Sequence, residues 1–182
     1  MQIYSPAEDS EFLSEIVLEY LKNPEINKNI SKVLDVGTGT GFQAEQCIKA
    51  GIKKTNILCA DINPDAINFV KKKGFNAVES DLFSDIKGKF DLIIFNPPYL
   101  PENQFDKEKD TTGGKEGDEI ILEFVKNLRF HLSENGIAFI LTSSLTPEKR
   151  FLSEVKKHDL NFKKIASKNI FFETLFVWKI TN

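Results

Sequence analysis

The motif Asn96-Pro97-Pro98-Tyr99 contains the residue types that can hold a planar nitrogen. Two consecutive prolines fix φ and lack an N–H, so they hold the backbone while its carbonyls stay free to accept hydrogen bonds. Pro97 also favours an extended conformation at Asn96. The side-chain oxygen of Asn96 and a carbonyl of Asn96 or Pro97 can then accept from one NH2 group, which suits an amide or an exocyclic base amine. Asn-Pro and Pro-Pro are also common turn signals, so the motif alone is equally compatible with a plain turn.

A glycine loop, Gly37-Thr38-Gly39-Thr40-Gly41, follows an apolar run that contains Asp35. Such a loop can bind a dinucleotide, bind another nucleoside, or merely turn tightly. A pyrophosphate requires a helix N-terminus without nearby anions, yet Asp35 precedes the loop and no lysine or arginine follows it before Lys49. Acidic surroundings favour a cationic ligand such as S-adenosylmethionine, which carries a sulfonium and an ammonium and no phosphate.

Two further acids are expected at neighbouring strand ends. Asp61 lies at the distance from the glycine loop where an acid binds ribose hydroxyls in a Rossmann-type site; its alternative role is to cap the following helix. Asp81-Leu82 offers an acceptor for an adenine amine and an apolar surface for its ring, and its alternative role is a turn.

The elements that must position these residues alternate between strand and helix, which predicts an α/β fold. We expect one Rossmann-like domain over residues 1–182, with a helical segment over 1–30 packed on it. Its seven-stranded, mostly parallel sheet has helices on both faces and ends in an antiparallel hairpin. The expected strands are 32–36, 56–60, 75–79, 90–95, 136–142, 161–167 and 174–180. The expected helices begin at Ser5, with a capping box closed by Glu8, and then cover 41–49, 63–73, 118–132 and 147–157.

All four polar segments fall at the carboxyl ends of predicted strands, where open α/β sheets bind ligands. Four such motifs at consecutive strand ends are far less expected by chance than any one alone. The long polar loop over 99–116 follows the last of them, and loops of this length in compact domains are commonly functional or mobile.

Composition sets modest bounds. Hydrophobic residues make up 41% and charged residues 28% of the 182 residues, which is typical of a soluble globular protein. No apolar run approaches the ~20 residues of a membrane span, and the N-terminus lacks the pattern of a signal peptide. Two cysteines, expected in a helix and a core strand, form no disulfide framework and indicate a reducing cytoplasm. No Cys/His cluster suggests a metal.

Taken together, the motifs resemble those of a known family. The segment Val33 to Gly41, Asp61, Asp81-Leu82-Phe83 and Asn96-Pro97-Pro98-Tyr99 resemble class I S-adenosylmethionine-dependent methyltransferases that modify planar nitrogens. More narrowly, Tyr4-x-Pro6-x-Glu8-Asp9-Ser10 and Gly113-Gly114-x-x-Gly117 resemble HemK-type protein-(glutamine-N5) methyltransferases of peptide release factors, in their short archaeal and eukaryotic branch. The similarity covers nearly the whole chain. One departure is Thr111-Thr112, where relatives often carry an aromatic residue.

The resemblance implies a role for particular residues. Cofactor contacts would come from Asp9, Ser10, Asp35, Gly37, Gly39, Gly41, Asp61, Ile62, Asp81, Leu82 and Asn96. The catalytic residues would be Asn96, Pro97, Pro98 and Tyr99, acting on the glutamine amide of a Gly-Gly-Gln motif in a class I release factor. Similar enzymes often work with a small zinc-binding activator subunit that adds a strand beside residues 75–79.

Three alternatives remain at this stage. The Asn96-Pro97-Pro98-Tyr99 motif, called the clamp below, would equally serve methylation of an exocyclic amine in DNA or RNA. The net charge of −3, the presence of only two arginines and the lack of a spare segment for target recognition disfavour nucleic acid as the substrate. A dehydrogenase would leave Asn96 to Tyr99 without a purpose. A non-catalytic S-adenosylmethionine-binding module is the third.

Overall fold

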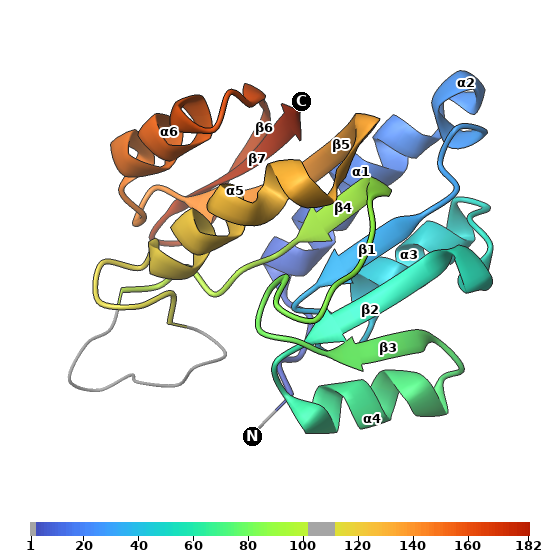
Figure 1. Cartoon of the computed structure of the whole chain (residues 1–182). Coiled ribbons are helices and arrows are strands. Elements are labelled where there is room, and N and C mark those ends of the chain that lie inside the picture. Colours follow the sequence, from blue (N-terminus) through green and yellow to red (C-terminus); the bar gives the residue numbers. More distant parts are fainter. Residues whose placement is uncertain (1–2, 102–111) are drawn as a thin grey trace.

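The computed structural model describes residues 3–101 and 112–182. A seven-stranded sheet in the order β3-β2-β1-β4-β5-β7-β6 forms its centre, and β3 and β6 are the edge strands (Figure 1). The strands are β1 Val33–Val36, β2 Ile57–Asp61, β3 Asn76–Glu79, β4 Phe90–Phe95, β5 Leu132–Ser143, β6 Asn161–Asn169 and β7 Thr174–Thr181. The helices are α1 Glu8–Leu21, α2 Pro24–Asn27, α3 Phe42–Lys49, α4 Pro64–Lys72, α5 Glu119–His131 and α6 Glu148–Lys157, with a 3₁₀ turn at Lys54–Asn56.

Strand direction follows the predicted pattern. The first five strands pair in parallel, and β7 pairs antiparallel with both β5 and β6. The predicted mostly parallel sheet with a C-terminal antiparallel hairpin is therefore confirmed.

Two apolar layers hold the sheet between helices. On one side, α1 and α3 pack Leu13 and Cys47 with Ile94 of β4. On the other, α5 and α6 pack Phe124 and Val155 with Phe95 of the same strand. Because successive side chains of a strand point to opposite faces, β4 serves both layers and reads as a continuous apolar run.

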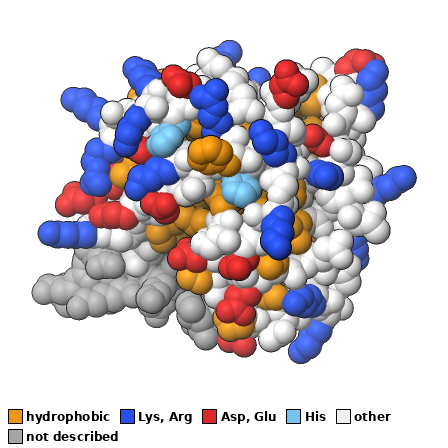
Figure 2. Space-filling view, in the orientation of Figure 1, with side chains coloured by type: hydrophobic (Ala, Val, Ile, Leu, Met, Phe, Trp, Pro, Cys, Tyr) orange, Lys and Arg blue, Asp and Glu red, His pale blue; other side chains and the backbone are white. Residues whose placement is uncertain are grey.

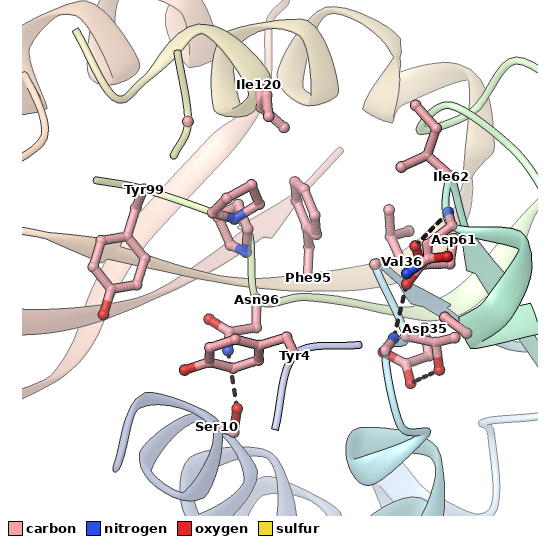
Figure 3. A pocket seen from close by; sticks show the side chains of 18 of the residues that line it. Tyr4, Ser10, Asp35, Val36, Asp61, Ile62, Phe95, Asn96, Tyr99 and Ile120 are labelled. Atoms are coloured by element: carbon pink, nitrogen blue, oxygen red, sulfur yellow. Dashed lines mark hydrogen bonds between the residues drawn. The ribbon is translucent and has the colours of Figure 1, made fainter. Parts of the chain in front are cut away.

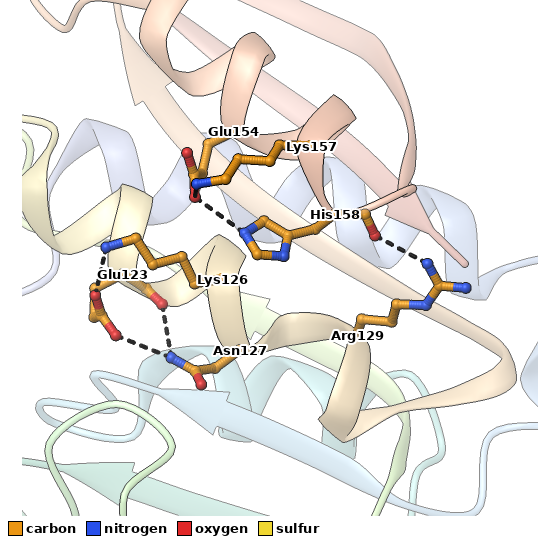
Figure 4. Close-up of polar contacts among 7 residues, drawn as sticks. All are labelled: Glu123, Lys126, Asn127, Arg129, Glu154, Lys157 and His158. Atoms are coloured by element: carbon orange, nitrogen blue, oxygen red, sulfur yellow. Dashed lines mark hydrogen bonds and ion pairs between the residues drawn. The ribbon is translucent and has the colours of Figure 1, made fainter.

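The outer surface of α5 and α6 is polar. Two salt bridges within these helices, Glu123 to Lys126 and Glu154 to Lys157, and a hydrogen bond between Glu154 and His158 lie along this surface (Figure 4). The Glu123–Lys126 pair is exposed on both sides, and such a pair contributes little to stability. Arg129 of α5 donates to the carbonyl of His158 and so connects the two helices. Basic and acidic side chains alternate over this face in Figure 2, without one continuous basic surface.

The predicted start of the first helix is wrong. The first helix begins at Glu8 rather than near Ser5, its N-cap is Ala7, and no side chain caps it. Tertiary contacts explain the difference, because the chain before the helix crosses the glycine loop: a Cβ on Gly39 would lie 3.6 Å from the carbonyl oxygen of Tyr4. The Tyr4 hydroxyl also donates to the Asp9 carboxylate, which holds this segment in place.

The bounds of two strands also differ from the prediction. β5 extends beyond both ends of the predicted strand, and β6 runs two residues further. Cys47 and Cys59 are both buried and free, as expected. Residues 102–111 of the predicted loop, including Thr111, lie outside the described residues. Among residues 3–101 and 112–182, no helix combines the length and apolar character that a membrane span requires.

Candidate active site

A cavity of about 410 Å³ lies at the carboxyl ends of β1, β2 and β4 (Figure 3). This size is within the usual range for small-molecule sites. The cavity brings together all but one of the residues for which the sequence predicts a role. They are Asp9, Ser10, Asp35, Gly37, Gly39, Asp61, Ile62, Asp81, Leu82, Asn96, Pro97, Pro98 and Tyr99.

Gly41 is the exception. It has φ +81° and precedes α3, and an added Cβ would lie 3.0 Å from a methyl carbon of Val70 in α4. Its role in this structure is to let the loop pack closely against α4. Gly37 and Gly39, with φ of +61° and +51°, turn the backbone of the same loop along the cavity wall. Only glycine adopts such angles without strain.

Asp61 links the glycine loop to the turn after β2. Its Oδ2 accepts from the backbone N–H of Gly39 at 2.8 Å, and its Oδ1 accepts from the N–H of Asn63 at 2.9 Å. The N-cap of α4 is Asn63, whose side chain accepts from Asp65 N. The alternative role considered for Asp61, capping of the helix that follows it, is therefore taken by Asn63. Asp61 itself lies in the cavity wall. Burial raises its pKa.

Asp35 lies beneath the loop and is 1% exposed. Its Oδ2 accepts from Thr38 Oγ1 at 2.6 Å and from the N–H of Ala44 at 3.3 Å. Burial outweighs these hydrogen bonds and raises the pKa of Asp35 to about 7, because ionisation in a dry site is costly. A cation bound in the cavity would favour the ionised form.

This pKa predicts a pH effect on stability. Between its ordinary value of 3.8 and about 7, Asp35 holds its proton in the folded chain and loses it in the unfolded chain. The free energy of unfolding should therefore fall as pH rises through this window, by up to about 4 kcal/mol. The Asp35→Asn variant lacks this contribution. Urea denaturation at a series of pH values should therefore show that the free energy of unfolding of the wild type, minus that of the variant, declines as pH rises. A free-energy difference that stays constant with pH would contradict the raised pKa of Asp35.

The charges around the cavity have one sign. Its described lining includes five carboxyl side chains and no lysine or arginine; the five are Asp9, Asp35, Asp61, Asp81 and Glu119. Beyond Asp61, apolar side chains form the wall: Ile62 is 55% exposed, and Leu82 has φ +50°. A non-glycine residue in this backbone region commonly marks a functional turn. The cavity fits a cationic ligand with an apolar ring and disfavours a phosphate.

Asn96 is held by contacts far away in the sequence. Its Nδ2 donates to Asp9 Oδ2 at 3.1 Å and to Ser10 Oγ at 3.2 Å, so α1 holds the amide from below (Figure 3). A carboxylate only accepts, so it selects the amino end of the Asn96 amide. Tyr4 in turn donates to both oxygens of Asp9 at 3.0 Å.

The other end of the Asn96 amide has no partner among the described residues. Its Oδ1 is buried and makes no hydrogen bond with residues 3–101 or 112–182. An unpaired buried acceptor is costly, about 1–3 kcal/mol, and a site that retains one commonly has a ligand to satisfy it. Because Oδ1 has less than 1 Å² of exposed surface, a neighbouring side chain must shift before a ligand can reach it.

The glycine motif after the long loop supports the clamp from its other side. An added Cβ on Gly113 would lie 2.6 Å from the carbonyl oxygen of Pro98, and one on Gly117 would lie 2.6 Å from that of Tyr99. Gly113 N also donates to the carbonyl of Leu100 at 2.9 Å. The two glycines therefore allow backbone-to-backbone contact behind the proline motif.

Sequence reasoning missed several lining residues. Tyr4 was part of a recognised motif but received no role. Gln43 donates from Nε2 to the carbonyl of Ser10 at 2.9 Å, while its Oε1 is buried and has no hydrogen-bond partner among the described residues. Phe95 and Ile120 also line the cavity. Their apolar character matched the pattern of a core strand and helix, which gave no local sign of a cavity.

The sheet order, with β7 inserted antiparallel between β5 and β6, and the cavity at the carboxyl ends of the parallel strands are those of a class I methyltransferase. Residues 7–171 match the family model "Methyltransferase small domain", and the chain belongs to this family.

Individual relatives give a narrower comparison than the family model does. MJ0928 of Methanocaldococcus jannaschii, whose name gives protein N5-glutamine methyltransferase as its expected activity, is 38% identical over 98% of this chain and 93% of its own. The release factor glutamine methyltransferase of Deinococcus radiodurans is 35% identical over 53% of this chain. Only 35% of that bacterial protein is covered.

A solved structure is similar over the full length. The Mtq2–Trm112 complex of E. cuniculi, described as responsible for methylation of the translation termination factor eRF1, has a chain with a TM-score of 0.80 and 26% identity. The match covers 100% of this chain and 99% of that one.

Proposed function

We propose that this protein transfers a methyl group from S-adenosylmethionine to the side-chain amide nitrogen of a glutamine, in the Gly-Gly-Gln motif of a class I peptide release factor. The observation that carries the proposal is the Asn96 amide, whose amino end is held by Asp9 and whose oxygen has no hydrogen-bond partner in the part of the chain that the structure describes. Full-length similarity to MJ0928 and to the eRF1-methylating complex supports the glutamine substrate.

S-adenosylmethionine, when bound, supplies an electrophilic methyl group on a sulfonium. The acidic lining suits this cation, and a ligand without phosphate needs no basic residue. We assign the backbone of Gly37 and Gly39 to its methionine end, Asp61 to the ribose hydroxyls, and Asp81 with Leu82 to the adenine. Ile62 would pack on the adenine ring.

An amide nitrogen is a poor nucleophile because its lone pair is delocalised into the carbonyl. In the proposal, Asn96 Oδ1 and the Pro97 carbonyl accept both protons of the substrate NH2 and turn its lone pair toward the methyl carbon. The N–C bond forms as the S–C bond breaks, and the product nitrogen then loses a proton to solvent. Orientation of this kind can lower a barrier by up to roughly 7–11 kcal/mol.

The test is transfer of labelled methyl from S-adenosylmethionine to three acceptors: an eRF1-type release factor, its Gly-Gly-Gln→Gly-Gly-Asn variant, and tRNA or DNA. We expect label on the first acceptor alone. Label on the asparagine variant would exclude the glutamine as the acceptor, and label on nucleic acid alone would establish the exocyclic-amine alternative.

We also propose that β3 pairs with an activator subunit. β3 is an edge strand of the sheet, and an unpaired edge readily accepts another strand. Beside it, Phe69 of α4 is 39% exposed. The similar E. cuniculi chain was solved with Trm112. Because release factors act in translation, the proposed compartment is the cytoplasm.

Mixing this protein with a Trm112-type subunit should give one complex in gel filtration, with higher activity than the chain alone. The proposal includes a zinc ion in that subunit, which metal analysis of the complex would detect. Full activity of the monomeric chain without the subunit would rule out an obligatory partner.

A further inference from the structure

Two adjacent phenylalanines are exposed at the turn between β6 and β7. Phe171 is 96% exposed and Phe172 is 89% exposed, more than any other large hydrophobic residue that the structure describes. Their rings lie 5.5 Å apart between centroids and contribute almost nothing to the core. Paired exposed aromatic side chains are typical of interaction sites.

The turn is held in place by the sheet. Ile170 N donates to the carbonyl of Glu173 at 2.9 Å, which closes the turn. The Glu173 carboxylate accepts a hydrogen bond from Ser143 at the end of β5. Ser144 N, just after β5, donates to the carbonyl of Thr174 at the start of β7 at 2.8 Å, which joins these two strand ends. A surface held in this way loses little conformational freedom when a partner binds.

The same turn is connected to the cavity. Tyr99, the last residue of the proline motif, lines the cavity; burial above all, and also the nearby Glu173, the residue after Phe172, raise its pKa. β7 begins opposite the carboxyl end of β5, so the turn lies at the cavity edge of the sheet. Leu145, which is 46% exposed, follows the end of β5 at this edge. A polypeptide that placed a side chain at Asn96 would pass close to these residues.

The local charge favours a protein over a nucleic acid. Glu173 lies in the turn, and Lys168, the nearest lysine along the chain, has its ammonium 6.0 Å from the ring centre of Phe12 in α1. Lys168 therefore contacts α1, and the turn itself, residues 170–173, carries an acid and no lysine or arginine.

We infer that Phe171 and Phe172 dock apolar side chains of the folded protein substrate beside its methyl-accepting glutamine. This inference rests on the proposed function and adds the surface that selects an intact protein. The docking surface acts on substrate binding, and the Asn96 clamp acts on the chemical step.

The test compares F171S/F172S with wild type and with F130S. Phe130 is 69% exposed near the end of α5, whose other end lines the cavity, so it is a matched exposed aromatic far from the site. Steady-state methylation of an eRF1-type release factor at saturating S-adenosylmethionine gives kcat and KM. For F171S/F172S we expect KM to rise about 10-fold, as for loss of interface aromatics, with kcat and the Kd of S-adenosylmethionine unchanged. F130S should behave as wild type.

The outcomes separate the two proposals. An unchanged KM in F171S/F172S, with methylation of the release factor intact, overturns the docking surface and leaves the proposed function standing. A wild-type protein that does not methylate the release factor overturns the proposed function itself. A wild-type dimer that F171S/F172S converts to a monomer, or RNA binding that this variant loses, would assign the two phenylalanines to another occupant and overturn the inference.

Discussion

Asn96→Ala is expected to lower kcat for release factor methylation by at least about 100-fold, the range seen when one orienting hydrogen-bond group is removed from an active site. The variant removes Oδ1, the unpartnered acceptor, and also the Nδ2 contact to Asp9. The cavity lining that would hold S-adenosylmethionine is otherwise intact, so its affinity, measured by titration calorimetry, should change far less. This separation would also exclude a non-catalytic binding module.

The Asp9→Asn variant tests the same amide with a milder change, and its loss of kcat is compared with that of Asn96→Ala. The variant keeps a side chain of the same size beside Asn96, but an amide can donate as well as accept. It therefore no longer selects which end of the Asn96 amide faces the cavity. We expect a loss of kcat of about 10-fold, smaller than in Asn96→Ala, because part of the population keeps the active orientation. Equal kcat in wild type and Asn96→Ala would refute the clamp, whatever the effect of Asp9→Asn.

Gly117→Ala is expected to reduce kcat by about 100-fold through backbone displacement, since a shift of ~1 Å at a reacting group can cost that much. Gly117 has φ +83°, and its Cβ would lie 2.6 Å from the Tyr99 carbonyl oxygen and 2.9 Å from Pro101 N. Neither neighbour is a side chain that can rotate away, so the chain after Asn96 must move.

Gly51→Ala is the matched control. Gly51 has a similar φ of +94°, but nothing lies within 4 Å of an added Cβ. Both variants therefore carry the backbone cost of a left-handed alanine, about 1–2 kcal/mol, which thermal unfolding will measure. Only Gly117→Ala should lose kcat. Similar kcat values for the two variants would mean that the glycine motif does not position the clamp.

Local sequence determined most of the elements. Strand β4 was predicted with its observed ends, since an apolar run bounded by charged residues and Asn-Pro defines a buried strand without reference to the rest of the chain. Likewise, Asn63-Pro64 predicted the start of α4, because the cap and the N1 proline act within one helical turn. The same reasoning gave the wrong start for α1, where a capping box was available but contacts of Tyr4 with Asp9 prevailed.

The sequence also determined which segments meet at the cavity, because parallel strands place their carboxyl ends at one edge whatever their order. Thirteen of the fourteen predicted residues line it, and Gly41 is the exception. Only the tertiary structure decided the pairwise contacts: Asp9 with Asn96 across 87 positions, Gly117 against Tyr99, and the β6–β7 turn beside the cavity. The physical reason is that strand order and helix packing set distances between segments far apart in the chain. Local propensity and spacing carry no information about those distances.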